Sequence, residues 1–101
     1  MGRSLGIVRE RQVRDLKLGE DYWVCRAAGS LGDADLVALR LGTPPELIEV
    51  KSDERSPYVH FGPAQREELK LAARIAGATP LLCWWPPRGK PCWIPAEEWP
   101  A

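Results

Sequence analysis

Apolar residues recur at helical spacing in two segments of the chain. The first segment runs over residues 4–18, with Ser4 as a suitable N-cap and Gly19 where a C′ glycine would end a helix. The apolar residues of this helix form only a loose stripe, at Leu5, Val8, Val13 and Leu16. We therefore expect a first helix whose buried face is weakly defined.

The second segment, residues 64–76, has a stronger helical pattern. Pro63 precedes it at a position suited to N1, and Gly77 follows it at a position suited to a C-cap. The apolar residues between them recur at helical spacing, at Leu69, Ala72, Ala73 and Ala76. This is the clearest helix that the sequence predicts.

Five short runs of apolar, aromatic and β-branched residues indicate strands, at residues 22–25, 34–41, 46–51, 81–85 and 92–94. The second and third runs are separated by Gly42-Thr43-Pro44-Pro45, a turn signal that predicts an antiparallel hairpin. A glycine-bearing loop precedes this hairpin, and a polar, irregular segment at residues 52–62 follows it. The predicted order α-β-β-β-α-β-β favours an α/β fold, a mixed β-sheet flanked by helices.

Length and composition limit the class of protein. The 101 residues suit one domain, so we expect a single domain over residues 1–101. Hydrophobic residues make up 45% of the chain and charged residues 28%, which is typical of a globular protein and too apolar for a disordered one. The sequence contains no apolar stretch long enough to span a membrane and no signal-peptide pattern, so we expect a cytoplasmic protein.

The net charge alone does not decide whether the partner is a nucleic acid. Lys plus Arg and Asp plus Glu both number 14, whereas phosphates favour basic proteins. The basic residues are concentrated near the start, because residues 1–26 carry six basic side chains against four acidic ones. A divalent metal bound to some of the acids would make the working charge more positive than the formal count.

The three cysteines and the single histidine form no recognisable zinc or nucleophile motif. Cys25, Cys83 and Cys92 include no C-x-x-C pair, so the sequence does not predict a structural zinc site. His60 has no accompanying nucleophile motif for serine-type hydrolysis. We expect the cysteines to be reduced and partly buried on strands.

Acidic residues and a lysine lie around the predicted hairpin. Glu49 and Lys51 are two residues apart on one strand, so their side chains point to the same face while Val50 points to the opposite layer. Asp35 opens the neighbouring strand, where its carboxylate can lie beside Glu49. Two carboxylates suit Mg²⁺, and a lysine beside them can orient water or stabilise charge on a phosphate. This arrangement favours metal-assisted phosphodiester hydrolysis over the ordinary alternative, a solvated ion pair at a strand edge.

At this point the sequence resembles a known family. Asp35 followed by Leu-Val-Ala, and then Ile48-Glu49-Val50-Lys51, resembles the PD-(D/E)xK nuclease core. More narrowly, the chain resembles the archaeal-type (Hjc-like) Holliday junction resolvases, which some phages also carry. The resemblance covers residues 8–94, and it implies the PD-(D/E)xK nuclease-like fold.

Three further segments carry this narrower resemblance. Arg9-Glu10-Arg11 is similar to the catalytic Glu-Arg pair on the first helix of the family. Arg26-Ala27-Ala28-Gly29-Ser30 is similar to the Arg-x-x-Gly-Ser loop between its first strand and its catalytic Asp. After the Glu-Val-Lys motif, a polar loop leads into a helix that opens with Gln65, and a strand-turn-strand follows, as in the family.

The resemblance implies a metal site and a catalytic lysine. Asp35 and Glu49 would be ligands of Mg²⁺, for which Mn²⁺ would substitute, and Val50 between the two motif residues would belong to the same metal site. Lys51 would be the catalytic lysine. Glu10 would approach the metals from the first helix, unless it is simply a surface acid.

The resemblance also implies residues that contact DNA. Ser30 would lie in a loop near the scissile phosphate, and Arg11 and Arg26 would hold backbone phosphates, a role that suits bidentate arginine. Gln65 would be a further DNA contact or only a residue at the start of its helix. Asp33 competes with Asp35 for the metal, and we prefer Asp35 because it directly precedes the apolar strand.

The function implied by the resemblance is a Mg²⁺-dependent endodeoxyribonuclease of DNA recombination and repair. It would resolve four-way (Holliday) junctions as a homodimer by paired symmetric nicks. Two alternatives are another PD-(D/E)xK nuclease of repair or restriction type and a non-catalytic DNA-binding relative. A non-catalytic relative would be expected to have lost one of Asp35, Glu49 and Lys51, and this chain has all three.

The chain departs from the family in its neutral charge and in the short segment after its last strand. Its last 18 residues are also rich in tryptophan. We expect these tryptophans to fill the core or a dimer interface, and the alternative is that they stack on unpaired bases. The residues concerned are Trp84, Trp85, Trp93 and Trp99.

Overall fold

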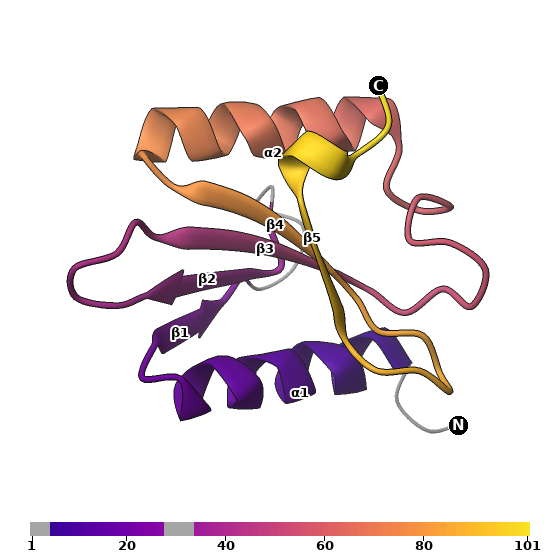
Figure 1. Ribbon diagram of the computed structural model, residues 1–101, viewed down its shortest axis with the longest axis horizontal. Helices are drawn as coiled ribbons and strands as arrows, with labels where there is room; N and C mark the ends of the chain where they lie inside the picture. The colour runs from indigo at the N-terminus through magenta and orange to yellow at the C-terminus, as the bar shows by residue number, and fades with distance from the viewer. Residues whose placement is uncertain (1–4, 28–33) are drawn as a thin grey trace.

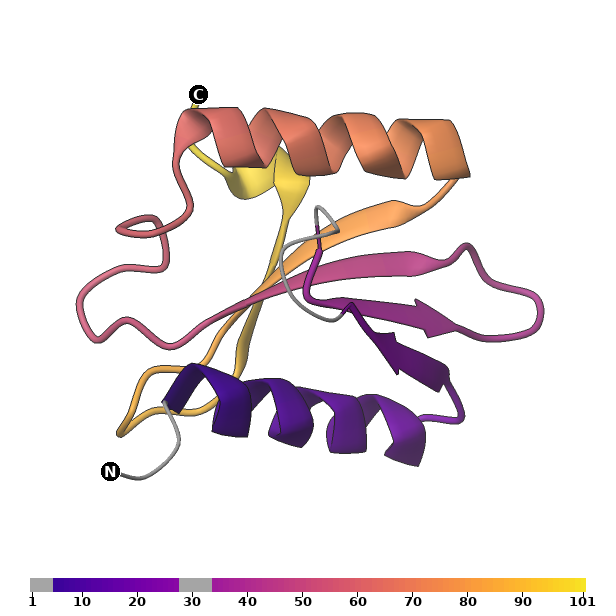
Figure 2. The same cartoon turned by 180° about the vertical axis from the view of Figure 1, so that it is seen from behind.

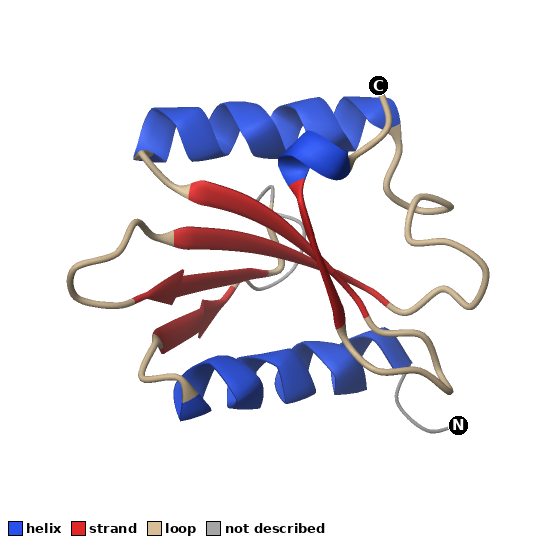
Figure 3. Cartoon of the chain, in the orientation of Figure 1, coloured by secondary structure: helices blue, strands red, loops and turns tan. Residues whose placement is uncertain are grey.

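The computed structural model describes residues 5–27 and 34–101. Its helices and strands follow in the order that the sequence predicts, and a 3₁₀ turn is added at the end (Figures 1 and 3). The elements are α1 (Leu5–Gly19), β1 (Trp23–Arg26), β2 (Leu36–Leu39), β3 (Glu46–Lys51), α2 (Pro63–Ala76), β4 (Thr79–Trp84), β5 (Cys92–Pro95) and η1 (Ala96–Glu98). None of the described helices is long and apolar enough to cross a membrane.

The five strands form one mixed sheet in the order β1-β2-β3-β4-β5. The β2–β3 pair is the antiparallel hairpin that the sequence predicts, with Leu36 opposite Ile48. The β3–β4 pair is parallel, so the chain must cross over between them, and α2 makes that crossover. The predicted α/β fold with a mixed sheet flanked by helices is therefore confirmed.

The two helices cover opposite faces of the sheet, as Figures 1 and 2 show from the two sides. α2 packs on its face through Leu69, which joins a core cluster with Phe61, Leu82 and Trp99. The rings of Phe61 and Trp99 meet edge to face, with their centroids 5.1 Å apart. Trp99 is only 7% exposed and therefore fills the core, as expected.

The ends of α2 are those that the sequence predicts. Pro63 is its first residue, and Gly77 caps it with a φ of 65°, a left-handed conformation that glycine adopts without strain. The buried residues of the helix differ in part, since they are Arg66, Leu69 and Ala73. Arg66 is buried because its guanidinium donates hydrogen bonds to the carbonyl oxygens of Phe61 and Ala101.

The buried face of α1 differs from the predicted apolar stripe. Its buried residues are Arg9, Val13 and Lys17, whereas Leu16 is 39% exposed. The prediction holds at Val13 and is wrong at Leu16, because Arg9 and Lys17 find partners in the chain after β4 and at the start of β3 and are buried instead. Val13 joins the core cluster on this face, which includes Leu36, Ile48, Val50 and Cys83.

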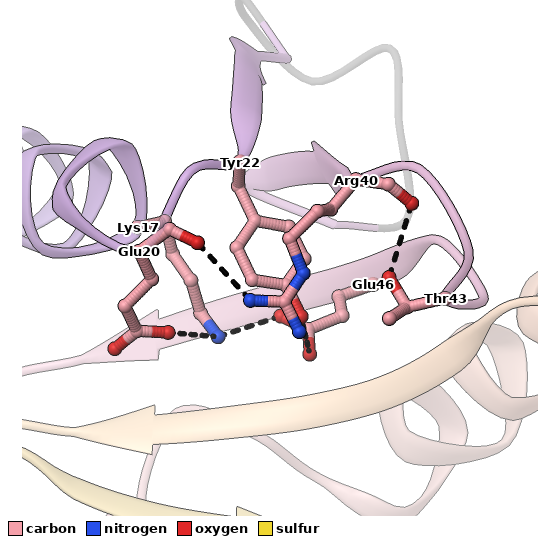
Figure 4. A network of polar contacts seen from close by, with 6 residues as sticks. All are labelled: Lys17, Glu20, Tyr22, Arg40, Thr43 and Glu46. Carbon is pink, nitrogen blue, oxygen red and sulfur yellow. Dashed lines mark hydrogen bonds and ion pairs between the residues drawn. The ribbon is translucent and has the colours of Figure 1, made fainter.

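The polar partners of Lys17 form a network at the beginning of β3 (Figure 4). The Nζ of Lys17 lies 2.7 Å from the Oε1 of Glu46, and the hydroxyl of Tyr22 donates to the Oε2 of Glu46 at 3.2 Å. The ammonium of Lys17 also lies 4.6 Å from the ring centre of Tyr22 and 4.7 Å from that of Trp93. These contacts tie the last turn of α1 to the sheet.

Smaller differences concern the ends of elements and the cysteines. α1 continues through Gly19, and the residue with a left-handed backbone is Asp21, at a φ of 68°. Aspartate tolerates this conformation better than most residues, so no glycine is required there. Cys83 is buried, but Cys25 and Cys92 are exposed, and all three thiols are free. The predicted glycine-bearing loop at residues 28–33 lies outside the described residues.

Candidate active site

Asp35 lies beside the end of β3, directly before the first residue of β2. Its backbone N–H donates to the carbonyl oxygen of Ile48 at 2.9 Å, which continues the hairpin pairing by one residue. Its side-chain Oδ2 then accepts a hydrogen bond from the backbone N–H of Val50 at 2.8 Å. The carboxylate of Asp35 is therefore held across β3 at the position of the Glu49-Val50-Lys51 motif.

Glu49 and Lys51 point to one face of the sheet and Val50 to the other, as strand alternation predicts. Val50 is part of the core cluster under α1. The Nζ of Lys51 lies 3.1 Å from the Oε2 of Glu49, and both side chains are largely buried, at 17% and 13% exposed. The ion pair is thus not the solvated strand-edge pair of the ordinary alternative.

Burial and shared negative charge raise the pKa of both carboxyls. The pKa of Glu49 rises to about 7, mainly because of burial and then because of the charge of Asp35, while Lys51 acts in the opposite direction. The pKa of Asp35 is also raised, mainly by burial, although the hydrogen bond from Val50 opposes this. The negative charge of Glu10 raises both values further. Burial is thus the main cause of both shifts, and the negative charges of neighbouring carboxylates add to it.

Glu10 reaches this region from α1 but has its own partner. Its Oε1 lies 3.2 Å from the Nη2 of Arg26, the last residue of β1. In the described residues, no three Asp, Glu, His or Cys side chains are close enough together to hold a metal ion. The structure therefore brings Asp35 and Glu49 together and leaves Glu10 beside them in an ion pair.

The donor set at Asp35 and Glu49 fits a hard divalent cation. Both groups supply carboxylate oxygens, and Mg²⁺ is usually bound by one or two carboxylates with several waters retained. A cation there would offset the negative charge of Glu10, which raises both pKa values, and that of Asp35, which raises the pKa of Glu49. Asp35, Glu49 and the backbone of Val50 would hold such an ion, with Glu10 as a further oxygen donor from α1.

The structure gives less information on the other residues that the sequence predicts to contact DNA. Ser30 and Asp33 lie outside the described residues. Arg11 is half-buried on α1, one residue after Glu10. Gln65 has a structural role, because its Oε1 accepts a hydrogen bond from the backbone N–H of Gly62 at 3.1 Å and so caps the start of α2.

Two polar arrangements near this site were not predicted. His60 pairs with Asp53 across the polar loop, with 2.7 Å between Nδ1 and Oδ1. Arg9, buried on α1, binds the chain just after β4. The one signal for Arg9 is its position four residues before Val13, on the buried stripe of the helix.

Comparison with known proteins identifies a structural relative. No family model matches the chain, and no curated protein matches it either. Among solved structures, the chain is similar to Hjc of Archaeoglobus fulgidus, a Holliday junction resolvase from an archaeal hyperthermophile. The TM-score is 0.78 at 26% sequence identity, and the match covers 93% of this chain and 75% of the resolvase. The chain shares its fold with this resolvase.

Proposed function

We propose that residues 1–101 form one nuclease domain, a metal-dependent endonuclease that resolves four-way DNA junctions by paired symmetric nicks. The observation that supports this most is the close grouping of Asp35, Glu49 and Lys51. The shared fold with an archaeal Holliday junction resolvase supports the choice of substrate. Such an enzyme would act on branched DNA in the cytoplasm.

The residues at this site divide the work of phosphodiester hydrolysis. Asp35 and Glu49 would hold a divalent cation, Mg²⁺ or Mn²⁺, which would supply an activated water and charge stabilisation at the phosphate. Lys51 presents its ammonium beside Glu49, where it stabilises negative charge on the reacting phosphate. Ser30 would approach the scissile phosphate from the loop before β2.

DNA would be held by residues around this centre. Arg26 is paired with Glu10, but 36% of its side chain is exposed, so it can also contact a backbone phosphate. Arg11 on α1 is a second candidate for such a contact, and Gln65 is a third at the start of α2. Because each chain has one Asp35–Glu49–Lys51 group, two opposed nicks require two copies, which supports a homodimer.

The test is a cleavage assay on a four-way junction and on linear duplex DNA of equal length. We expect the junction to be cut preferentially, at symmetric positions on two strands, in Mg²⁺ or Mn²⁺. EDTA should abolish cleavage. Light scattering at micromolar protein should give the mass of a dimer.

Each arm of this test can contradict the proposal. Cleavage that survives EDTA would overturn the metal-dependent mechanism. Equal cleavage of junction and duplex would indicate a general PD-(D/E)xK nuclease instead of a resolvase. A monomer that nevertheless nicks the two strands together would overturn the paired-site model.

A further inference from the structure

The loop between β4 and β5 carries two cations and no acid. Its sequence is Pro86-Pro87-Arg88-Gly89-Lys90-Pro91, so Arg88 and Lys90 flank the glycine at the tip. Both side chains are exposed. Neither forms an ion pair within the described residues, whereas Arg26 and Lys51 near the active site each have an acidic partner. The two charges at the tip are therefore available to an external anion.

The loop is closed by contacts of its own. The backbone N–H of Gly89 donates to the carbonyl oxygen of Pro86 at 3.2 Å, and the indole N–H of Trp85 donates to the carbonyl oxygen of Gly89 at 3.1 Å. A Cβ at Gly89 would lie 2.6 Å from the Cγ of Pro86, so the turn is too tight for a side chain there. Three prolines further restrict the backbone. The loop therefore presents its two cations from a defined turn.

Arg9 fixes this loop to α1. Its side chain is buried, and its Nε donates to the carbonyl oxygen of Trp85 at 3.2 Å. Its Nη2 donates to the carbonyl oxygens of Pro86 at 2.8 Å and Pro87 at 3.1 Å, and its guanidinium lies 4.6 Å from the ring centre of Trp85. The buried guanidinium of Arg9 thus binds the backbone of three consecutive residues, Trp85 to Pro87. These contacts hold the start of the loop against α1.

The anchored loop begins at the active-site end of the sheet. The backbone N–H of Trp85 donates to the carbonyl oxygen of Lys51 at 2.8 Å, directly beyond the last β3–β4 pair. The residue after Arg9 on α1 is Glu10, which influences the charges of Asp35 and Glu49. In Figures 1 and 2 the loop lies beside the N-terminal end of α1. Its attachment points are therefore both next to residues of the candidate active site.

We propose that Arg88 and Lys90 form a second contact with the DNA backbone, beside the strand that is cleaved. This inference rests on the proposed nuclease function and names a binding element for it. A DNA duplex presents a dense row of phosphates, and two cations held on a fixed turn bind them without reading sequence. Such a local contact also explains how a chain with no net charge can hold a polyanion.

The chain offers a control pair of equal charge on α2. Lys70 and Arg74 are also one lysine and one arginine, and they lie in the second half of α2, away from the β4–β5 loop; Lys70 differs from the loop cations in having an acidic partner, Glu67, at 3.1 Å. We compare the double variant Arg88→Gln/Lys90→Gln with Lys70→Gln/Arg74→Gln. Thermal unfolding of both should stay at the wild-type midpoint, which shows that the loop and α2 remain folded.

The readout is the affinity for a four-way junction in EDTA, measured over a series of salt concentrations. The loop double variant should bind about tenfold more weakly at about 0.1 M salt, and the slope of log K against log salt should fall by about two. The α2 double variant should keep both the affinity and the slope of the wild type.

A loop double variant with the wild-type slope would overturn the role of the loop while leaving the nuclease proposal intact. The same holds if both double variants lose the same amount, because the effect would then follow total charge and not position. Wild-type protein that binds neither junction nor duplex would overturn both proposals.

Discussion

β3 carries two buried glutamates three residues apart, and they lie in opposite electrostatic situations. Glu46 at its start is 16% exposed and Glu49 near its end is 13% exposed. Because side chains alternate along a strand, Glu46 faces α1 and Glu49 faces the other side. The same residue type, on one strand and equally buried, can therefore be compared directly.

The difference between them lies in the partners. Glu46 has Lys17 at 2.7 Å and the hydroxyl of Tyr22 at 3.2 Å (Figure 4). Burial by itself would lower the pKa of Lys17, but the hydrogen bond and ion pair with Glu46 outweigh it and raise that pKa. Glu49 has Lys51 but must share its surroundings with Asp35, and its pKa rises to about 7.

The comparison separates a structural ion pair from a candidate catalytic one. Glu46 lies 2.7 Å from Lys17, whose other acidic partner, Glu20, is exposed, so the pair joins α1 to the sheet. At Glu49 two carboxylates face one lysine, and the unmatched charge is what a divalent cation would neutralise. The exposed fractions of the two side chains are similar, so their partners distinguish them, because a second buried carboxylate, that of Asp35, adds to the pKa rise of Glu49.

The largest expected effect is on cleavage. Glu49→Gln and Lys51→Ala should each lower the rate of junction cleavage by about a thousandfold or more, because each removes a group that we propose holds the metal or acts on the reacting phosphate. Junction affinity in EDTA should change little, since the arginines proposed to hold phosphates remain. Single-turnover cleavage and binding on the same junction provide the two measurements.

Glu46→Gln is the matched control, because it removes the same charge from the same strand. At a temperature where all the variants are folded, it should cut at nearly the wild-type rate. If Glu46→Gln and Glu49→Gln lost equal activity, the division between a structural and a catalytic glutamate would be wrong. Cleavage by Glu49→Gln at nearly the wild-type rate would also contradict a catalytic role for Glu49.

The next effect is on stability. Lys17→Met should lower the free energy of unfolding by about 3 kcal/mol, because it leaves Glu46 buried without a cation. Adding Glu46→Gln to this variant should recover part of the loss, since the unpaired charge is then gone. Urea unfolding at neutral pH measures both changes. A double variant no more stable than Lys17→Met would contradict the account.

The smallest effect concerns pH. The folded-state pKa of Glu49, about 7, lies above its ordinary value of 4.5, so the folded protein keeps a proton that the unfolded chain has released. The free energy of unfolding therefore falls as the pH rises from 4.5 to about 7. Glu49→Gln removes this loss and should be more stable than the wild type by on the order of 2 kcal/mol at about pH 8.

Two conditions make this test specific to Glu49. In EDTA at about pH 4 the variant and the wild type should unfold alike, because the carboxyl is then protonated in both states. Mg²⁺ added at about pH 8 should raise the unfolding midpoint of the wild type and have less effect on Glu49→Gln. A stability difference that stays constant with pH would show that its source is not the ionisation of Glu49.

The sequence predicted those features that depend on neighbours along the chain. The β2–β3 hairpin follows from its turn residues, α2 follows from Pro63 and Gly77, and strand alternation places Glu49 and Lys51 on one face. The close position of Asp35 follows from the hairpin register. In each case the conformation of nearby residues was enough to predict the feature.

The buried cations could not be predicted in this way. Arg9 binds backbone 76 to 78 positions away, and Lys17 pairs with Glu46 on a strand that comes much later in the chain. A lysine or arginine is ordinarily expected at the surface, and only a specific distant partner reverses that expectation. The helical pattern therefore favoured Leu16 as a core residue, although it is exposed.

The unusual buried face of α1 has a consequence for local unfolding. Val13 is the one buried apolar residue of this helix in the described chain, and polar contacts of Arg9, Lys17 and Glu10 add to its attachment. A helix held mainly by polar contacts is easier to detach as a unit than one held by a hydrophobic face. If α1 opens, Glu10 moves away with it and the loop between β4 and β5 loses its contacts with Arg9. The fraction of molecules in which α1 is docked beside the candidate active site therefore depends partly on the strength of the Lys17–Glu46 ion pair at the other end of the helix.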